Sequence, residues 1–154
     1  MNGALVFVAD LMRQLPIKMR LGMMAVSSYP GQSTASKGAT IKRSLDSNLE
    51  LRGLRVLIVD DILDTGNTLG VVQREIATRE PASLETAVLL RKTDKDHGGV
   101  KADYVGFDIA DEFVVGYGLD FDGHYRNLPH IAVLKREAYE RAGCSTEDGD
   151  GRVR

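Results

Sequence analysis

One segment limits the possible folds of this chain more than any other. Residues 55–59 (RVLIV) are almost continuously apolar, and Asp60 and Asp61 follow them directly. Such runs are typical of strands buried on both faces, as in parallel sheets. A helical pattern covers residues 69–79, Pro81 ends it, and a second apolar run covers residues 84–90. A strand, a helix and a strand in this order predict an α/β fold built on a parallel sheet.

The same alternation extends through the rest of the chain. Residues 3–15 are apolar around the first two turns, which predicts a mostly buried helix that ends near Pro16. Residues 29–40 (YPGQSTASKGAT) form a long loop, and loops of this length are usually functional or disordered. Further strands are predicted at residues 18–28, 41–45, 104–109, 113–117 and 131–134, with a turn at 48–52, a charged loop at 91–100 and a helix at 135–142. Residues 143–154 are predicted to be a disordered tail after one domain of residues 1–142.

Length and charge argue against several classes of protein. The chain has 154 residues, the size of one domain, and a net charge of −2, so no basic groove for nucleic acid is predicted. Cys144 is the one cysteine and forms neither an internal disulfide nor a cysteine-built zinc site, which favours a reducing cytoplasm. No apolar run approaches the roughly 20 residues of a membrane-spanning helix. We therefore expect a cytoplasmic globular protein with neither a nucleic-acid nor a membrane partner.

The acidic pair and the turn after it predict a site for a sugar phosphate. Ligands of open α/β sheets bind at the carboxyl ends of the strands, where Asp60 and Asp61 fall. Residues 64–68 (DTGNT) then open a helix whose free N–H groups attract anions. Gly66 lets the backbone approach a phosphate closely, Thr65 and Thr68 add hydroxyl donors, and adjacent carboxylates hold Mg²⁺ or sugar hydroxyls. The lysine of a P-loop is missing from this turn.

Two other interpretations of this segment stay open. A strand-to-helix turn with Asp and Thr is often only a helix N-cap. The run LRVLIVDD also resembles the acidic start of a response-regulator receiver domain, and DYVGFDI at residues 103–109 resembles the strand that carries its phosphorylated aspartate. Against a receiver, more than fifty residues precede the acidic pair, 46 residues follow Asp108, and DTGNT has no role.

Residues 56–69 (VLIVDDILDTGNTL) resemble the phosphoribosyl-pyrophosphate (PRPP) signature of type I phosphoribosyltransferases, in which four apolar and two acidic residues precede a DTGxT loop. MNGALVFVADL, MAVSSY and residues 100–131, with DYVGFDI and FVVGYGLD, are similar to hypoxanthine(-guanine) phosphoribosyltransferases. The resemblance covers residues from about 1 to 136. It implies the type I fold, a mainly parallel sheet flanked by helices with a small hood and a flexible lid loop.

The resemblance also implies a reaction. The enzymes of this family salvage purines by transferring the 5-phosphoribosyl group of PRPP to hypoxanthine or guanine, which gives IMP or GMP and pyrophosphate. Mg²⁺ is the implied cofactor, and a homodimer or homotetramer is the implied assembly.

On this resemblance, Asp60 and Asp61 hold the ribose hydroxyls of PRPP, directly or through Mg²⁺. Asp64 exchanges a proton with N7 of the purine and is the implied catalytic residue. Binding of the phosphate and pyrophosphate groups falls to Thr65, Gly66, Asn67, Thr68, Gly3 and Arg126.

The same resemblance assigns the purine site and the lid. Lys101 donates to O6 of the base, Phe113 stacks on the ring, and Val114 contacts its edge through backbone groups. Asp120 contacts a second Mg²⁺ or the exocyclic amine of guanine. Ser28 and Tyr29 begin the lid loop. His97, His124 and His130 lack the spacing of metal ligands, and no role is assigned to them.

Family members carry a helical segment and a buried strand before the position of Met1, and only residues 1–3 of their pyrophosphate loop would remain here. The resemblance therefore implies an N-terminally shortened domain that lacks the family's N-terminal strand, or a reading frame that starts upstream. It leaves a second hypothesis open, a catalytically impaired relative that binds PRPP or a nucleotide and acts as a regulator.

Overall fold

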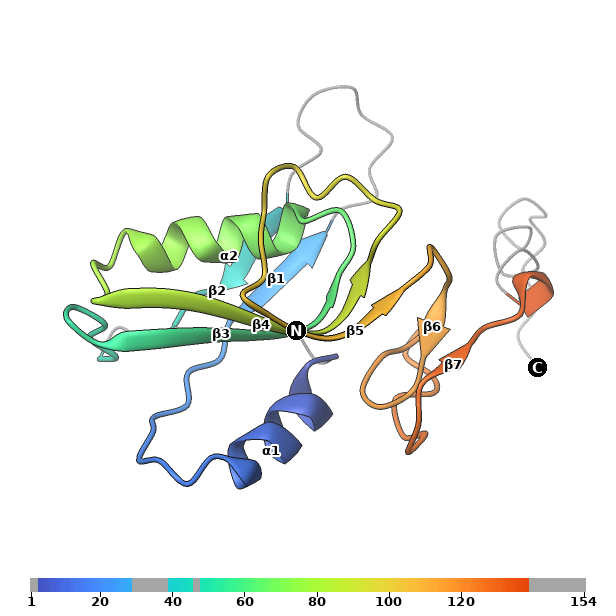
Figure 1. Cartoon of the computed structure of the whole chain (residues 1–154), viewed down its shortest axis with the longest axis horizontal. Coiled ribbons are helices and arrows are strands. Elements are labelled where there is room, and N and C mark those ends of the chain that lie inside the picture. The colour runs from blue at the N-terminus through green and yellow to red at the C-terminus, as the bar shows by residue number, and fades with distance from the viewer. Residues whose placement is uncertain (1–2, 29–38, 46–47, 139–154) are drawn as a thin grey trace, which may run out of the picture.

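A parallel three-stranded sheet forms the centre of the computed structural model, which describes residues 3–28, 39–45 and 48–138 (Figure 1). Its strands lie in the order β3 (Arg55–Leu63), β4 (Ser83–Lys92) and β5 (Tyr104–Ile109). Helix α2 (Asn67–Ala77) connects β3 to β4. The prediction of a strand, a helix and a parallel strand in this part of the chain is confirmed.

Strand β3 is four residues longer than predicted, and this changes where the acidic pair lies. The parallel ladder continues past Val59, because Asp60 is in register with Val88 and Leu63 with Arg91. Asp60 and Asp61 therefore lie within the last half of the strand rather than after it. Strand β4 also runs two residues further than predicted, so that Lys92 lies opposite Ile109 of β5. The carboxyl ends of all three strands meet at one edge of the sheet.

Two helices cover opposite faces of this sheet (Figure 1). On one face α2 buries Leu69 against Leu63 and Val88, and its far end packs Val72 and Ile76 against Leu51. On the other face α1 (Leu5–Gln14) places Phe7 against a cluster around Leu89, Leu90 and Leu119. No helix among the described residues has the length and apolar character to cross a membrane.

Helix α1 is present as predicted, but the expectation that it is mostly buried is wrong. No residue within it is buried, and Leu5 is 54% exposed. Phe7 packs on the core, whereas Leu5 and Met12 are exposed and the other apolar side chains of the helix are only partly buried.

The remaining strands form two small antiparallel sheets. β1 (Ala25–Ser28) pairs with β2 (Ala39–Arg43), and Met24 and Val26 pack on the α2 face of the molecule. Residues 18–24 are not a strand, because no other described segment pairs with them and their apolar side chains are largely exposed. β6 (Val114–Val115) pairs with β7 (Ala132–Val133), and both are shorter than predicted.

Several predictions fall partly or wholly outside the described residues. They concern Tyr29 and most of the expected lid loop, residues 139–142 of the expected last helix, and the tail of residues 143–154. Residues 136–138, at the start of that helix, are helical.

Candidate active site

Two adjacent carboxylates lie at the carboxyl edge of β3 in very different surroundings. Asp60 is only 2% exposed, while Asp61 is half-buried. Each accepts a hydrogen bond from the next backbone amide: the N–H of Asp61 donates to Asp60 Oδ1 and the N–H of Ile62 to Asp61 Oδ1, both at 3.0 Å. Burial, and then the neighbouring charge of Asp61, raise the pKa of Asp60 to about 8. The pair therefore favours holding a proton, a cation or a donor such as a sugar hydroxyl.

Gly3, predicted from the resemblance to bind pyrophosphate, lies directly against Asp61. A Cβ atom on residue 3 would stand 1.6 Å from Asp61 Oδ2, so any larger residue there would push the Asp61 carboxylate out of its position. Its carbonyl oxygen lies against Gly118, where a Cβ would come within 2.1 Å and φ is +101°. The beginning of the described chain, the acidic pair and the FVVGYGLD segment thus meet at one place.

The DTGNT turn begins α2 two residues earlier than predicted. Gly66 is the N-cap residue in the left-handed conformation, with φ of +76°, and no side-chain hydrogen bond caps the helix. The interpretation of this motif as a side-chain N-cap is therefore wrong. The turn instead places Thr65, Gly66, Asn67 and Thr68 around the amino end of α2, where backbone N–H groups and the helix dipole favour an anion.

Asp64, the predicted catalytic residue, lies beside a buried lysine that sequence analysis did not single out. Lys92 is 9% exposed, and its Nζ lies 3.8 Å from Asp64 Oδ1. The same ammonium group lies 2.8 Å from Asp111 Oδ1, while Lys95 lies 2.7 Å from Asp111 Oδ2. These two lysines hold the pKa of Asp111 below its usual range. Asp64 Oδ1 is itself buried and accepts no hydrogen bond from the described residues.

Lys92 completes the group of charges at this edge of the sheet. It was missed because β4 was predicted to end at Leu90, which placed Lys92 in a charged loop. Extended by two residues, β4 carries Lys92 to the carboxyl edge of the sheet, one position beyond the pairing of Leu63 with Arg91 and beside Asp64.

Lys101, predicted to contact the purine, lies elsewhere. The residue is exposed, and its backbone carbonyl accepts a hydrogen bond from Gln73 Nε2 on α2 at 2.9 Å. Gln73 also donates to Thr86 at 2.9 Å, so this part of the chain is tied to the middle of α2. The structure records no contact between Lys101 and another predicted site residue within the described ranges.

The other predicted purine-site residues lie on and near the small sheet of β6 and β7. Phe113 is 39% exposed, and its ring meets Phe121 edge to face at a centroid distance of 5.5 Å. Val114 is in register with Val133. Asp120 and Arg126 form an ion pair at 2.7 Å, and Arg126 also donates to the Gly118 carbonyl at 2.7 Å. The Gly123 amide donates to the second oxygen of Asp120.

The capacity of the site carboxylates to bind Mg²⁺ depends on which of their oxygens already have partners. The described residues contain no group of three acidic, His or Cys side chains that could hold a metal. Mg²⁺ in proteins commonly keeps several waters and binds through one or two carboxylates plus substrate phosphates. Asp60 and Asp61 each use one oxygen on a backbone amide, and their carboxylates also interact with each other, so the pair lies side by side as the one or two carboxylates of that mode of binding. Both oxygens of Asp120 already have partners, which fits it less well.

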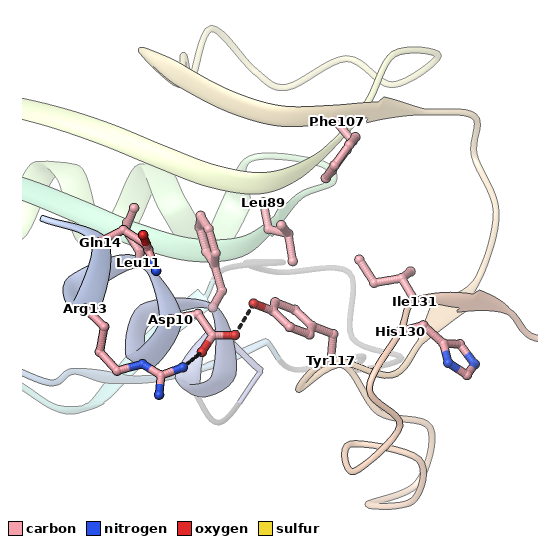
Figure 2. Close-up of a pocket in the computed structure, with 10 residues that line it drawn as sticks. Asp10, Leu11, Arg13, Gln14, Leu89, Phe107, Tyr117, His130 and Ile131 are labelled. Carbon is pink, nitrogen blue, oxygen red and sulfur yellow. Dashed lines mark hydrogen bonds and ion pairs between the residues drawn. The ribbon is translucent and has the colours of Figure 1, made fainter.

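A separate cavity of about 580 Å³ lies on the α1 face of the sheet (Figure 2). Leu89 and Phe107 of the sheet, α1, and Tyr117 and His130 line it. The Tyr117 hydroxyl donates to Asp10 Oδ2 at 2.5 Å, which lowers the pKa of Asp10 and raises that of Tyr117. Among the residues that the structure describes, no predicted site residue lines this cavity.

A family model and several known proteins match most of this chain in sequence. A family model described as "Phosphoribosyl transferase domain" matches residues 1–122. The hypoxanthine-guanine phosphoribosyltransferase of Mycobacterium tuberculosis (strain ATCC 25618 / H37Rv) is 45% identical over 140 residues, which are 91% of this chain and 68% of the relative. That of Bacillus subtilis (strain 168) is 43% identical over 141 residues, covering 91% of this chain and 77% of the relative.

Solved structures are similar over the same region. A hypoxanthine phosphoribosyltransferase from Staphylococcus aureus superposes with a TM-score of 0.82 at 39% identity, covering 90% of this chain and 74% of that one. A mutant hypoxanthine phosphoribosyltransferase from Trypanosoma cruzi, in a ternary complex with substrates, gives 0.81 at 42% identity, covering 90% and 75%. These matches overturn the receiver-domain alternative, and Asp108 instead forms an ion pair with Arg91 at 2.7 Å.

Proposed function

The chain belongs to the phosphoribosyltransferase family and, within it, to the hypoxanthine-guanine phosphoribosyltransferases, and from that premise we propose how its own residues perform the reaction. The enzyme serves purine salvage: it transfers the 5-phosphoribosyl group of PRPP to hypoxanthine or guanine and releases pyrophosphate. The residue roles rest on one observation. The acidic pair Asp60–Asp61, the DTGNT turn before α2 and the contact between Lys92 and Asp64 all lie at one edge of the sheet.

Asp60 and Asp61 bind the sugar half of PRPP. Each has one carboxylate oxygen engaged on the backbone, which fixes the direction of the other. The turn of Thr65, Gly66, Asn67 and Thr68 receives the 5′-phosphate at the amino end of α2, where backbone donors suit an anion. Holding the sugar at two points orients its anomeric carbon toward the base, the kind of positioning that supplies much of an enzyme's rate.

The purine lies between the edge of the sheet and Phe113. Lys92 donates to O6 of the base. Its ammonium group can only donate, which suits the oxygen at that position, and it lies 3.8 Å from the carboxylate of Asp64, the residue assigned to the same base. Asp64 accepts or returns the N7 proton beside it. The partly exposed ring of Phe113 stacks on the base, Val114 contacts its edge through the backbone, and Asp120 faces the exocyclic amine of guanine. Lys92 thereby takes the role that the resemblance assigned to Lys101.

Charge develops on the pyrophosphate as it leaves. Gly3 presents its backbone beside Asp61, and Arg126 exchanges its ion pair with Asp120 for the pyrophosphate. Mg²⁺ held by Asp60, Asp61 and the substrate's oxygens would neutralise negative charge on the leaving group. The small sheet of β6 and β7 acts as the hood, and the segment from Ser28 and Tyr29 acts as the lid that excludes water.

Direct assay of the reaction tests this proposal. The protein is incubated with Mg²⁺, PRPP and, separately, hypoxanthine, guanine and adenine, with an EDTA control, and nucleotide and pyrophosphate are quantified. We expect IMP and GMP in a 1:1 ratio with pyrophosphate, and no AMP. PRPP binding in calorimetry without turnover would support the impaired regulatory relative instead. No nucleotide and no PRPP binding would contradict both hypotheses.

A further inference from the structure

The charged loop between β4 and β5 touches the candidate catalytic residue through a histidine. His97 is half-buried, and its Nδ1 lies 2.5 Å from the backbone carbonyl oxygen of Asp64. A carbonyl oxygen only accepts, so Nδ1 carries the hydrogen and donates it. The imidazole is thus bonded to the backbone of the residue whose carboxylate lies beside Lys92.

The backbone of the same loop also lies against the DTGNT turn before α2. A Cβ on residue 66 would come within 2.3 Å of the His97 carbonyl oxygen, and one on residue 70 within 2.9 Å of Val100 Cγ2. The loop reverses immediately after His97, because the Val100 N–H donates back to the His97 carbonyl at 3.1 Å. Gly98 and Gly99, with φ of +60° and +79°, provide the left-handed conformations of that turn. His97 is therefore held against the Asp64–Gly66 turn by its backbone as well as its ring.

Ion pairs fix the first part of this loop. Lys92 and Lys95 both bind Asp111, at 2.8 and 2.7 Å, and Lys92 lies 3.8 Å from Asp64 Oδ1. Asp64 is consequently contacted on both sides: Lys92 lies beside its carboxylate, and His97 binds its backbone. Neither contact involves the cavity on the α1 face, which His130 lines.

We propose that His97 is a positioning residue for Asp64, fixing its backbone so that its carboxylate meets the proton of the purine. This inference rests on the proposed function, since it assigns His97 a part in the same reaction. His97 does not touch the substrate and acts only through Asp64. A displacement of a catalytic group by about 1 Å can cost on the order of 10²-fold in rate, so a single hydrogen bond at this backbone has a measurable effect.

Replacement of His97 tests the role of the donor. We expect His97→Ala to lower kcat about 3–10-fold, the change in rate that corresponds to one neutral hydrogen bond, with KM for hypoxanthine and PRPP within about twofold. His97→Asn keeps an N–H donor at the same distance along the side chain and should restore kcat to within about twofold of wild type. His130→Ala, on the opposite face of the sheet, removes a histidine without touching Asp64 and should leave kcat unchanged.

A double-mutant cycle shows whether His97 acts through Asp64. In an Asp64→Asn background, we expect His97→Ala to change kcat by less than about twofold, because the positioned carboxylate is already gone. Three results would each overturn the proposal. These are a full loss of kcat on adding His97→Ala in the Asp64→Asn background, no loss of kcat in His97→Ala alone, or failure of His97→Asn to restore kcat. Thermal melting of every variant ensures that the comparison is between folded proteins. An inactive wild type would refute the proposed function, whereas an active one with unchanged His97→Ala refutes only this inference.

Discussion

Replacing Asp60 with Asn should make the substrate-free protein more stable at neutral pH and reduce the dependence of its stability on pH. The carboxyl group is 2% exposed, and burial together with the charge of Asp61 raises its pKa to about 8, against 3.8 in the absence of these effects. The folded state therefore binds a proton that the unfolded chain has already released. Because the folded-state pKa is the higher one, the free energy of unfolding falls as the pH rises from about 4 to about 8.

The size of the effect follows from the two pKa values. Each pH unit between them costs up to 1.36 kcal/mol per proton, so raising the pH from 5 to 7 lowers stability by roughly 2–3 kcal/mol through this residue. Asn keeps the oxygen that accepts the Asp61 amide at 3.0 Å but carries no charge at any pH. The advantage of Asp60→Asn over wild type should thus grow by roughly that 2–3 kcal/mol between pH 5 and pH 7.

Urea denaturation at pH 5, 6, 7 and 8, in metal-free buffer with EDTA, measures this difference. Asp108→Asn is the matched control, because the exposed Asp108 is paired with Arg91 and its pKa is lowered rather than raised. Its contribution is lost only as the pH falls through its lowered pKa, so it should give no gain between pH 5 and pH 8. A stability difference between Asp60→Asn and wild type that stays constant from pH 5 to pH 8 would refute the reasoning.

Three further outcomes are expected. Asp64→Asn should lower kcat by about 10²–10⁴-fold in steady-state assays, the usual range for a general acid or base, and an unchanged kcat would make Asp64 structural only. Gly66→Ala should cost about 1–3 kcal/mol in chemical denaturation and weaken PRPP binding in calorimetry, because φ is +76° and the new Cβ would meet the His97 carbonyl. Leu63→Ala should lower the free energy of unfolding by about 2–5 kcal/mol, because the side chain is 1% exposed in the α2-facing core; a loss under 1 kcal/mol would contradict that packing.

The centre of the fold was predictable because its signals are local. The apolar run at residues 55–59, the helical periodicity after it and the second apolar run specify β3, α2 and β4 without knowledge of distant contacts. The end of β3 was not predictable in this way. Asp60 and Asp61 look like the residues that terminate a strand, and only pairing with β4 keeps them within it. The prediction that α1 is mostly buried failed for a related reason. The apolar pattern of residues 3–15 shows that the helix has an apolar surface, but not whether another part of the chain covers it.

The residues of the candidate site also differ in whether their sequence signals are local. Asp60, Asp61, Asp64 and the glycine turn are contiguous in the sequence, so one motif was enough to find them. Lys92 and His97 come from another strand and another loop, and they reach Asp64 only through the register of β4 with β3 and the turn at Gly98–Gly99. Sequence alone offered several lysines and three histidines without ranking them. The resemblance assigned the purine contact to Lys101, and His97 was given no role because the histidines lack the spacing of metal ligands. The domain boundary, the homo-oligomer and the cytoplasmic location stay predictions.

The most direct test of the account is the dependence of base recognition on Lys92, measured as steady-state kcat/KM for hypoxanthine and guanine. We predict that Lys92→Met raises KM for both bases about 10–100-fold, as expected when a hydrogen bond from a charged donor is lost. PRPP affinity should change little, and Lys101→Met, at an exposed position, should stay within about twofold of wild type. Asp111 keeps Lys95 as a partner in Lys92→Met, which helps the variant retain its fold. A loss of recognition in Lys101→Met but not in Lys92→Met, or wild-type enzyme that uses adenine as well as hypoxanthine, would contradict the account.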